Sequence, residues 1–263
     1  MGDNALGDAW DDIDGVRIHA LVSTAAPTDA PAIVFVHGLG VSTRYLEPTM
    51  ALLAPAYRVA GLDLPGFGRS HARRTLTLPE LAHALARWLD ARDIGPAVFV
   101  GNSFGCQVIV ELAVRAPHRT LGLVLNAPTM DPAHRSAWTM IWRVARDVPH
   151  EPLSLAFIVA RDYLRAGLGR VLRTLRLALD DRIEEKLPRI AVPVMIVCGA
   201  HDPVVTVRWG DEVAQLTGRE RPGAAGASLH VVHDAAHALP YDDPEAFAPL
   251  IRAMVERVCT ATT

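Results

Sequence analysis

Cysteine is scarce in this chain, and the few cysteines that are present lie far apart. The 263 residues include three, Cys106, Cys198 and Cys259, and two of them lie inside apolar runs where a reduced thiol packs as a small hydrophobic group. An odd number of widely spaced cysteines gives no basis for a disulfide framework. We therefore expect reduced thiols and a cytoplasmic location.

The sequence also lacks membrane-spanning and secretory signals. No uninterrupted apolar run approaches the ~20 residues that a membrane-spanning helix needs. The first residues, Met1–Asp8, are acidic and lack the basic region and apolar stretch of a signal peptide. A net charge of −3 gives no electrostatic reason to expect nucleic acid or a membrane surface as a partner. The sequence therefore gives no support for a membrane-spanning, secreted or nucleic-acid-binding protein.

Apolar residues, by contrast, are abundant. Half of the residues are hydrophobic and 21% are charged, which is a composition typical of globular proteins. A chain of this length can bury a large core, and it fits one domain of generous size or one domain that carries an insertion.

Apolar, β-rich runs alternate with segments of helical periodicity. Strands are predicted at Val16–Ser23, Ile33–His37, Arg58–Asp63, Ala97–Asn102, Leu121–Asn126, Val194–Cys198 and Leu229–Val232. Helices are predicted at about Tyr45–Ala54, Leu78–Asp93, Phe104–Ala116, Val204–Thr217 and Asp243–Val258. The later strands are almost continuously apolar, which indicates an α/β fold with a doubly wound, mostly parallel sheet. In such a sheet the functional groups are expected in loops at the carboxyl ends of the strands.

One segment interrupts this alternation. Residues 128–188 contain no convincing strand but three helical stretches, at about Ala133–Asp147, Pro152–Ala166 and Arg170–Leu187. We interpret 128–188 as a helical lid, inserted after the sixth core strand when an N-terminal ribbon strand is counted separately. Residues 1–127 and 189–263 then form the core. An ordinary long crossover between two strands is the alternative.

The segment Gly101–Gly105 reads Gly-Asn-Ser-Phe-Gly and lies between an apolar run and a predicted helix. A strand, a Gly-x-Ser-x-Gly segment and a helix, in that order, are the context of a nucleophile elbow. Such a turn holds its serine in a strained backbone conformation that points the hydroxyl away from the sheet. A Cβ at position 101 or 105 would collide with the neighbouring strand or helix, which favours glycine at both. Ser103 is therefore the candidate nucleophile.

A serine nucleophile needs a base within hydrogen-bonding reach and an acid that orients the base. In this topology the expected order along the chain is serine, acid, histidine. Asp202 follows the predicted strand Val194–Cys198, and His237 follows the last predicted strand. Both therefore lie at carboxyl ends of strands. Their neighbours His201 and Asp234 are interpreted as loop and turn residues.

Five motifs occur in the order found in one known superfamily. They are His-Gly-Leu-Gly at 37–40, Asp-Leu-Pro-Gly-Phe-Gly-Arg-Ser at 63–70, the elbow at 101–105, Gly-Ala-His-Asp at 199–202, and Ala-His at 236–237 followed by Asp-Pro-Glu-Ala-Phe at 243–247. On these motifs, which span nearly the whole chain, the protein resembles the α/β-hydrolase superfamily. The resemblance is to its lid-bearing serine esterase and meta-cleavage-hydrolase-like branch.

The resemblance implies roles for several further residues. In such families the His-Gly-x-Gly loop lines the oxyanion hole, so the backbone N–H groups of Leu39 and Phe104 are expected to face the developing oxyanion. Gly38 is expected in the substrate-binding region. His37 resembles a loop-bracing histidine, and Arg69 resembles a scaffold group rather than a substrate ligand.

The identity of the acid stays open at this point. Some relatives place the acid after the strand that precedes the lid, and here Asp131 follows Leu121–Asn126 by five residues. Because triad roles are settled by geometry and not by position, Asp131 is an alternative to Asp202. It is otherwise a residue of the lid hinge.

Substrate preference is expected to come from the lid. Met130, Trp138 and Trp142 are candidates for an apolar ceiling over the substrate, although packing of the lid onto the sheet explains them equally well. Between positions 131 and 176, four acids are outnumbered by arginines at Arg135, Arg143, Arg146, Arg161, Arg165, Arg170, Arg173 and Arg176. This excess favours an anionic ligand, or it marks a solvated helix face.

The resemblance implies a serine hydrolase of the carboxylesterase type, acting as a monomer or homodimer on an ester of a small to medium apolar molecule through an acyl-enzyme. No metal or organic cofactor is needed, and no ligand spacing matches a metal site. A carbon–carbon bond hydrolase, a lactonase or a thioesterase on the same triad is the alternative. Carbon–carbon hydrolases usually have tryptophan where this chain has Ala238, which disfavours the first of these. A non-catalytic receptor for a small molecule is a further alternative on this fold.

Overall fold

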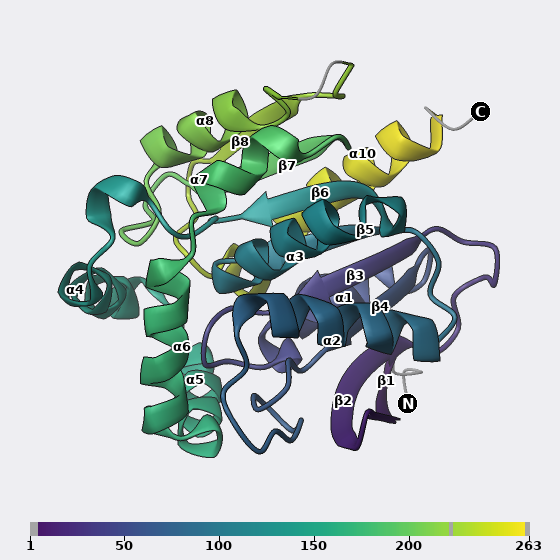
Figure 1. Ribbon diagram of the computed structural model, residues 1–263, viewed down its shortest axis with the longest axis horizontal. Coiled ribbons are helices and arrows are strands. Elements are labelled where there is room, and N and C mark those ends of the chain that lie inside the picture. Colours follow the sequence, from purple (N-terminus) through teal and green to yellow (C-terminus); the bar gives the residue numbers. More distant parts are fainter. Residues whose placement is uncertain (1–4, 221–222, 261–263) are drawn as a thin grey trace.

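The computed structural model describes residues 5–220 and 223–260, and its centre is one eight-stranded sheet (Figure 1). The strand order is β1-β2-β4-β3-β5-β6-β7-β8. The strands are β1 (Leu6–Ile13), β2 (Val16–Ser23), β3 (Ala32–Val36), β4 (Arg58–Leu62), β5 (Ala97–Asn102), β6 (Thr120–Asn126), β7 (Val194–Gly199) and β8 (Ala227–Val232). β1 and β2 pair antiparallel, as do β2 and β4, and the other pairs are parallel. The predicted mostly parallel, doubly wound sheet is confirmed.

Helices connect the strands and begin close to the predicted positions. The α-helices are α1 (Glu47–Leu53), α2 (Leu78–Ala91), α3 (Phe104–Arg115), α4 (Ala137–Asp147), α5 (Leu153–Ala166), α6 (Leu168–Asp180), α7 (Ile183–Lys186), α8 (Val207–Leu216), α9 (Leu239–Asp242) and α10 (Pro244–Thr260). Short 3₁₀ helices lie at Thr43–Tyr45, Pro117–Arg119, Pro132–His134, Val148–His150 and Leu187–Arg189. α2 shows why such boundaries are predictable, because Thr77 and Glu80 form a capping box at its start, with Pro79 in the first turn.

Both faces of the sheet are covered by helices. α2, α3 and α8 pack on one face, where their apolar side chains join those of the sheet in a buried cluster that includes Val34 and Trp88. α1 and α10 pack on the other face, in a second cluster that includes Phe35 and Phe247. Neighbouring strand residues such as Val34 and Phe35 point to opposite faces. This two-sided burial explains why the strands are almost continuously apolar.

The three cysteines are free thiols. Cys106 and Cys198 are buried within the apolar core, and Cys259 is exposed. Burial raises the pKa of the Cys198 thiol to about 12, so it remains protonated and unreactive.

Strand β1 was not predicted from the sequence. It pairs with β2 over its full length, and Leu6, Ala9 and Ile13 are buried. Aspartate and glycine are depleted in strands, and this stretch contains both. Because β1 lies at the edge of the sheet, its aspartates remain near solvent, where a strand tolerates charge.

The segment between β6 and β7 holds α4, α5, α6 and α7, so the helical insertion after the sixth strand is confirmed. In Figure 1, α4, α5 and α6 lie beyond the end of the sheet to which the β6 arrow points, at the carboxyl ends of the parallel strands. α6 contacts both α4 and α5. The predicted third helical stretch is divided into α6 and α7, and Gln107 of α3 donates to the Ala178 carbonyl near the end of α6 at 3.0 Å. Among the helices described, none has the length and apolar character needed to cross a bilayer.

Candidate active site

The strands that precede the candidate residues end at the same level of the sheet. Asn102 of β5 pairs with Asn126 of β6, Asn126 pairs with Val197 of β7, and Val197 pairs with His230 of β8. The segments that follow these four strands therefore emerge at one edge. That edge carries Ser103 directly after β5.

Ser103 occupies the turn between β5 and α3. Its backbone has φ 54° and ψ −118°, a conformation that residues other than glycine rarely adopt. A Cβ on Gly105 would lie 2.2 Å from the Val36 carbonyl oxygen, and a Cβ on Gly101 would lie 2.8 Å from the Cys106 nitrogen. Close backbone contacts thus require glycine at both positions, as the sequence predicted. They also fix the start of α3 against β3.

His237 and Asp202 form a hydrogen-bonded pair. Nδ1 of His237 lies 2.8 Å from Oδ2 of Asp202, whose side chain is fully buried. The other oxygen, Oδ1, accepts the N–H of Val204 at 2.6 Å and that of Val205 at 2.9 Å. These donors hold the carboxylate in one orientation. The carboxylate in turn keeps the proton of neutral His237 on Nδ1 and leaves Nε2 available as a base.

The electrostatic surroundings of His237 strengthen it as a base. Burial alone would lower its pKa, but the negative charge of Asp202 and the hydrogen bond to it outweigh burial. The pKa of His237 is therefore raised above its ordinary value of 6.5. A more basic imidazole accepts a hydroxyl proton more readily.

Asp131 has other partners. Its Oδ2 lies 2.9 Å from Nδ1 of His134 and accepts a hydrogen bond from Arg208 at 3.2 Å. It also caps the 3₁₀ helix that opens the lid segment. The geometry therefore places Asp131 at the start of the lid segment and makes Asp202 the partner of His237.

Gly199 holds the loop of the acid against the loop of the histidine. A Cβ at this position would lie 2.4 Å from the carbonyl oxygen of Ala235 and 2.5 Å from that of Ala236. The flanking residues His201 and Asp234 are exposed to solvent. Their exposure agrees with their interpretation as loop and turn residues.

The loop after β3 brings Gly38 against the nucleophile. A Cβ on Gly38 would lie 3.5 Å from Cβ of Ser103. His37 braces this loop, because its Nδ1 donates to the Gly38 carbonyl at 2.8 Å and its Nε2 accepts the Leu64 N–H at 2.9 Å. Burial lowers the pKa of His37, so the ring is neutral and both bonds are kept. His37 thus has a structural position and is not a second base.

The two expected oxyanion donors come from different segments: Leu39 from the loop after β3, and Phe104 from the start of α3. Phe104 is the first residue of α3, so its N–H has no acceptor within the helix. Leu39 lies beneath the lid, where the Tyr163 hydroxyl is 3.5 Å from the Leu39 carbonyl oxygen. The Tyr163 ring also covers Gly40, since a Cβ there would lie 2.5 Å from it. The role of these two N–H groups in an oxyanion hole stays a prediction.

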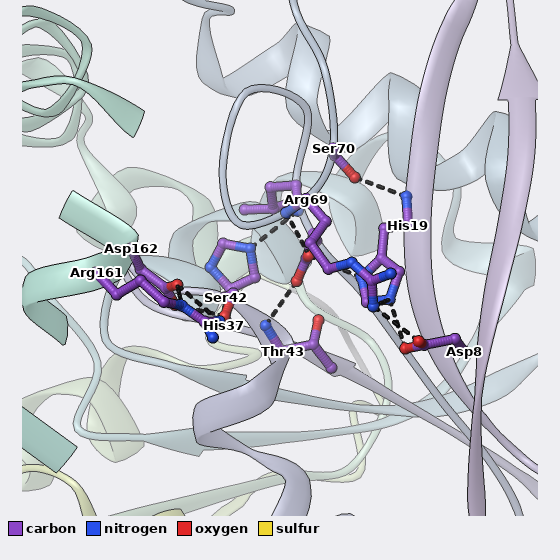
Figure 2. Close-up of polar contacts among 11 residues, drawn as sticks. Asp8, His19, His37, Ser42, Thr43, Arg69, Ser70, Arg161 and Asp162 are labelled. Atoms are coloured by element: carbon purple, nitrogen blue, oxygen red, sulfur yellow. Dashed lines mark hydrogen bonds and ion pairs between the residues drawn. The ribbon is translucent and has the colours of Figure 1, made fainter. Parts of the chain in front are cut away.

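A polar network around Asp63 joins β2 to the segments that follow β3 and β4 (Figure 2). Asp63 accepts the N–H groups of Thr43 and Arg69, each at 2.8 Å, and its carboxylate lies 2.8 Å from Nδ1 of His19. Burial would raise the pKa of Asp63, but the hydrogen bond with His19 and the other donors hold it below its ordinary value. The Arg69 side chain pairs with Asp8 at 2.8 Å. Arg69 is therefore tied into the scaffold, as expected.

The lid contributes contacts that the sequence did not reveal. Asp162 of α5 is fully buried and accepts a hydrogen bond from the Ser42 hydroxyl (Figure 2). Arg170 of α6 donates to the carbonyl oxygens of Ala72 at 2.8 Å and Arg74 at 2.7 Å. Helical periodicity shows which residues share a face, but it does not show which face turns inward. These residues therefore carried no signal in the sequence.

Two lid carboxyl groups act on the histidine loop. Glu151 accepts the Ala238 N–H at 3.2 Å, and the negative charge of the buried Asp147 carboxyl, at the end of α4, contributes to the raised pKa of His237. Burial and the nearby carboxyl groups of Asp242 and Asp147 raise the pKa of Glu151, so it is protonated at neutral pH. The lid is thus connected directly to the loop that carries the candidate base.

The expected ceiling residues have different surroundings. Met130 is buried in the apolar core. Trp138 and Trp142 of α4 are 82% and 58% exposed. An exposed indole does not enclose a substrate. The exposure of Trp138 and Trp142 therefore gives no support to their predicted role as ceiling residues.

Comparison with known proteins identifies the family. The profile of the alpha/beta hydrolase family matches residues 33–250. The chain belongs to this family. It is similar to 3-oxoadipate enol-lactonase 1 of Acinetobacter baylyi, with 27% identity over 90% of this chain and 93% of that protein.

Two further similarities concern an esterase and a solved structure. Pimeloyl-(acyl-carrier protein) methyl ester esterase of Neisseria meningitidis serogroup B is 27% identical, over 88% of this hydrolase and 95% of that enzyme. The crystal structure of the enol-lactonase from Burkholderia xenovorans LB400 superposes with a TM-score of 0.78 and 22% identity, over 94% and 100% of the two chains. The protein is accordingly an enzyme of the hydrolase type, and the bond it cleaves is a matter for proposal.

Proposed function

We propose that the protein is a serine hydrolase that cleaves a carboxylic ester of a small to medium apolar molecule. The observation that carries the proposal is the pairing of His237 with Asp202 at 2.8 Å, at the edge of the sheet where Ser103 occupies a strained turn. A base oriented by a buried carboxylate, together with a serine held on a tight turn, suits acyl transfer. The esterase and lactonase relatives support the same chemistry.

The reaction would run in two halves. Nε2 of His237 takes the hydroxyl proton as Oγ of Ser103 attacks the ester carbonyl carbon, and the carbonyl oxygen becomes an oxyanion. The N–H groups of Leu39 and Phe104 would stabilise that charge, and losing one such donor typically lowers the rate about 10²–10³-fold. His237 then gives its proton to the departing alkoxide, which leaves an alcohol and an acylated serine.

Water completes the second half. It gives a proton to His237 and attacks the acyl carbon, and the carbon–Oγ bond breaks. Ser103 regains its proton from His237 as the carboxylic acid is released. Asp202 remains ionised throughout and stabilises the imidazolium formed in each half.

Hydrolysis of p-nitrophenyl esters, from acetate to long acyl chains, tests the proposal. The wild-type enzyme should release p-nitrophenolate, and Ser103→Ala should lower kcat about 10⁴-fold or more. Ser154→Ala removes an exposed hydroxyl from α5 and should keep the wild-type rate. A fluorophosphonate probe should label the wild-type enzyme and Ser154→Ala but not Ser103→Ala. Undiminished turnover by Ser103→Ala would reject Ser103 as nucleophile.

A cyclic ester is the second candidate, because two of the similar proteins are enol-lactonases. The chemistry is the same, except that the departing alkoxide stays attached to the acyl chain. Ring opening of lactones, followed by acid release at constant pH, should be compared with the p-nitrophenyl series by kcat/KM. A higher kcat/KM for lactones, lost in Ser103→Ala, would make the enzyme a lactonase.

A further inference from the structure

Exposed apolar side chains are concentrated on the lid. Eleven large hydrophobic residues are exposed among the described residues, and ten of them lie between positions 138 and 172. These ten, which we call the lid apolar surface, are Trp138, Ile141, Trp142, Val144, Val148, Leu153, Phe157, Leu164, Leu168 and Leu172. They belong to α4, α5, α6 and the α4–α5 connection. Isolated exposed apolar residues are ordinary, but a concentration of this kind marks an interaction site.

Helix α5 carries an apolar stripe on its solvent side. Leu153, Phe157, Ala160 and Leu164 follow one another at steps of four, three and four residues, so they share one face of the helix. All four are exposed, Phe157 by 78% and Leu164 by 84%. The opposite face is buried, and it carries the carboxylate of Asp162.

Helix α4, like α5, exposes large apolar side chains and buries a carboxylate. Trp138 and Trp142 are exposed one turn apart, whereas Asp147 is buried. Arg143 is partly buried and donates to the Val204 carbonyl of the core at 3.0 Å. A helix that packs on an apolar core normally buries its apolar face and exposes its charges. Here Arg143 and Asp147 lie toward the core beside the buried Met140, and the other large apolar side chains of α4 remain outside.

The same helices expose positive charge. Arg146, Arg165, Arg173 and Arg176 are exposed, and Asp180 is the exposed acid of α4–α6. Arg165, Arg173 and Arg176 have no ion-pair partner within the described residues. The lid helices therefore expose apolar side chains together with Arg165, Arg173 and Arg176, which are available to an anionic partner.

We propose that the lid apolar surface docks on an anionic lipid surface. The indole, phenyl and leucyl side chains would enter the boundary between headgroups and acyl chains, and the exposed arginines would face anionic headgroups. Helices with Trp, Phe and Leu beside Arg bind bilayer interfaces in this way. A second copy of this chain fits the face less well, because a two-fold interface would bring the arginines of both copies together.

This proposal replaces the expectation that the protein has no membrane partner. That expectation rested on the net charge of −3, which describes the whole chain. The charge is unevenly distributed, since the lid helices are basic whereas β1 is acidic. Because the lid lies at the carboxyl ends of the strands, docking would hold the candidate site beside the lipid surface (Figure 1).

Sedimentation with lipid vesicles tests the proposal. The wild-type protein should bind vesicles of equal parts phosphatidylcholine and phosphatidylglycerol, and should bind pure phosphatidylcholine vesicles more weakly. Changing Arg165, Arg173 and Arg176 to Gln should weaken partition onto the anionic vesicles about fivefold per arginine. High salt should weaken it in the same direction. The double variant Phe157→Ser, Leu164→Ser should bind both compositions about tenfold more weakly per side chain.

Matched variants separate docking from general charge and from catalysis. Arg17→Gln, Arg87→Gln and Arg219→Gln together remove three exposed arginines outside the lid, and this triple variant should bind as the wild type does. Ser103→Ala should also bind normally, so a failure of the proposed ester hydrolysis would leave the vesicle result unchanged. Circular dichroism spectra of all variants should match the wild type, because every lid and control substitution is at an exposed position.

Three results would overturn the proposal. The first is no sedimentation of the wild-type protein with the anionic vesicles. The second is an equal loss of binding in the lid and control arginine variants, which would show attraction without a defined surface. The third is a dimer, seen by light scattering, that Phe157→Ser, Leu164→Ser converts to a monomer, because a second copy would then cover this face.

Discussion

The sheet core and the lid differ in where they place charged and large apolar side chains. Strands β3 to β7 are apolar and almost completely buried, whereas α4 and α5 bury the carboxylates of Asp147 and Asp162 and expose tryptophan, phenylalanine and leucine. The core is stabilised by apolar area removed from water, at about 25 cal/mol per Å². The lid is attached partly by buried apolar residues such as Met140 and Leu155 and partly by hydrogen bonds and ion pairs, each with a net contribution of about 0.5–1.5 kcal/mol.

Because of this difference, an apolar residue has a different explanation in each region. An apolar residue of the core is explained by its packing, and its substitution tests stability. An apolar residue on the outer face of the lid contributes little to folding, so its presence calls for a partner outside the chain. A buried carboxylate also needs an explanation, and here it has two. In the lid, Asp162 holds α5 to the core through Ser42, and in the loop after β7, Asp202 orients His237.

The largest expected contrast is between Asp202 of the core loop and Asp131 at the start of the lid segment. Asp202→Asn should lower kcat about 10⁴-fold, because asparagine neither orients His237 nor stabilises its charged form. Asp131→Asn should leave most of the activity. The residual activity of Asp202→Asn should extend to lower pH, since the Asp202 charge raises the pKa of His237 and its removal lets burial lower it.

The pH dependence of kcat/KM on p-nitrophenyl acetate measures both effects. In the wild type, activity should fall as pH decreases through the raised pKa of His237, where the imidazole becomes protonated. An acid limb at the same pH in Asp202→Asn would contradict the assignment of Asp202. A loss in Asp131→Asn as large as that in Asp202→Asn would instead favour Asp131 as the acid.

The next contrast applies one substitution to both regions. Phe99 is fully buried in β5, and Phe157 is 78% exposed on α5. Phe99→Ala should reduce the free energy of unfolding by about 3–5 kcal/mol, whereas Phe157→Ala should change it by no more than about 0.5 kcal/mol. Urea unfolding measures both values. A large loss in Phe157→Ala would mean that the outer face of the lid is packed within the folded chain.

The sequence predicted the core far better than the lid, for a physical reason. A strand buried on both faces must be apolar throughout, and a tight turn such as the one at Ser103 requires glycine at fixed positions, so both leave local patterns. The orientation of a lid helix depends on partners distant in sequence, as Asp162 depends on Ser42. The sequence suggested Trp138 and Trp142 as ceiling residues but gave no indication that they face solvent.

A third prediction tests whether buried charge attaches the lid. Asp162→Ala removes the acceptor of the Ser42 hydroxyl and leaves that buried donor without its partner. The free energy of unfolding should decrease by about 1–3 kcal/mol. Asp180→Ala, at an exposed position at the end of α6, should change it little. Equal values for the two variants in urea unfolding would show that the inward charges of the lid do not stabilise its attachment.

The last contrast is at the junction of α4 and α5, where the lid contacts the histidine loop. Burial and the carboxyl groups of Asp242 and Asp147 raise the pKa of Glu151 above 4.5 in the folded protein. The unfolded chain releases this proton near the ordinary pKa. Between the two pKa values the unfolded state therefore binds fewer protons, and stability falls as pH rises. Glutamine has no such proton, yet its oxygen can still accept the Ala238 N–H.

Glu151→Gln should therefore match the wild type near pH 4 and have the higher free energy of unfolding near pH 8. Urea unfolding at the two pH values measures the difference. Glu185→Gln, which replaces an exposed carboxylate of α7 by the same amide, is the matched control variant. If Glu151→Gln and the wild type were equally stable at both pH values, Glu151 would ionise freely in the folded protein. The contact between lid and histidine loop would then not depend on a retained proton.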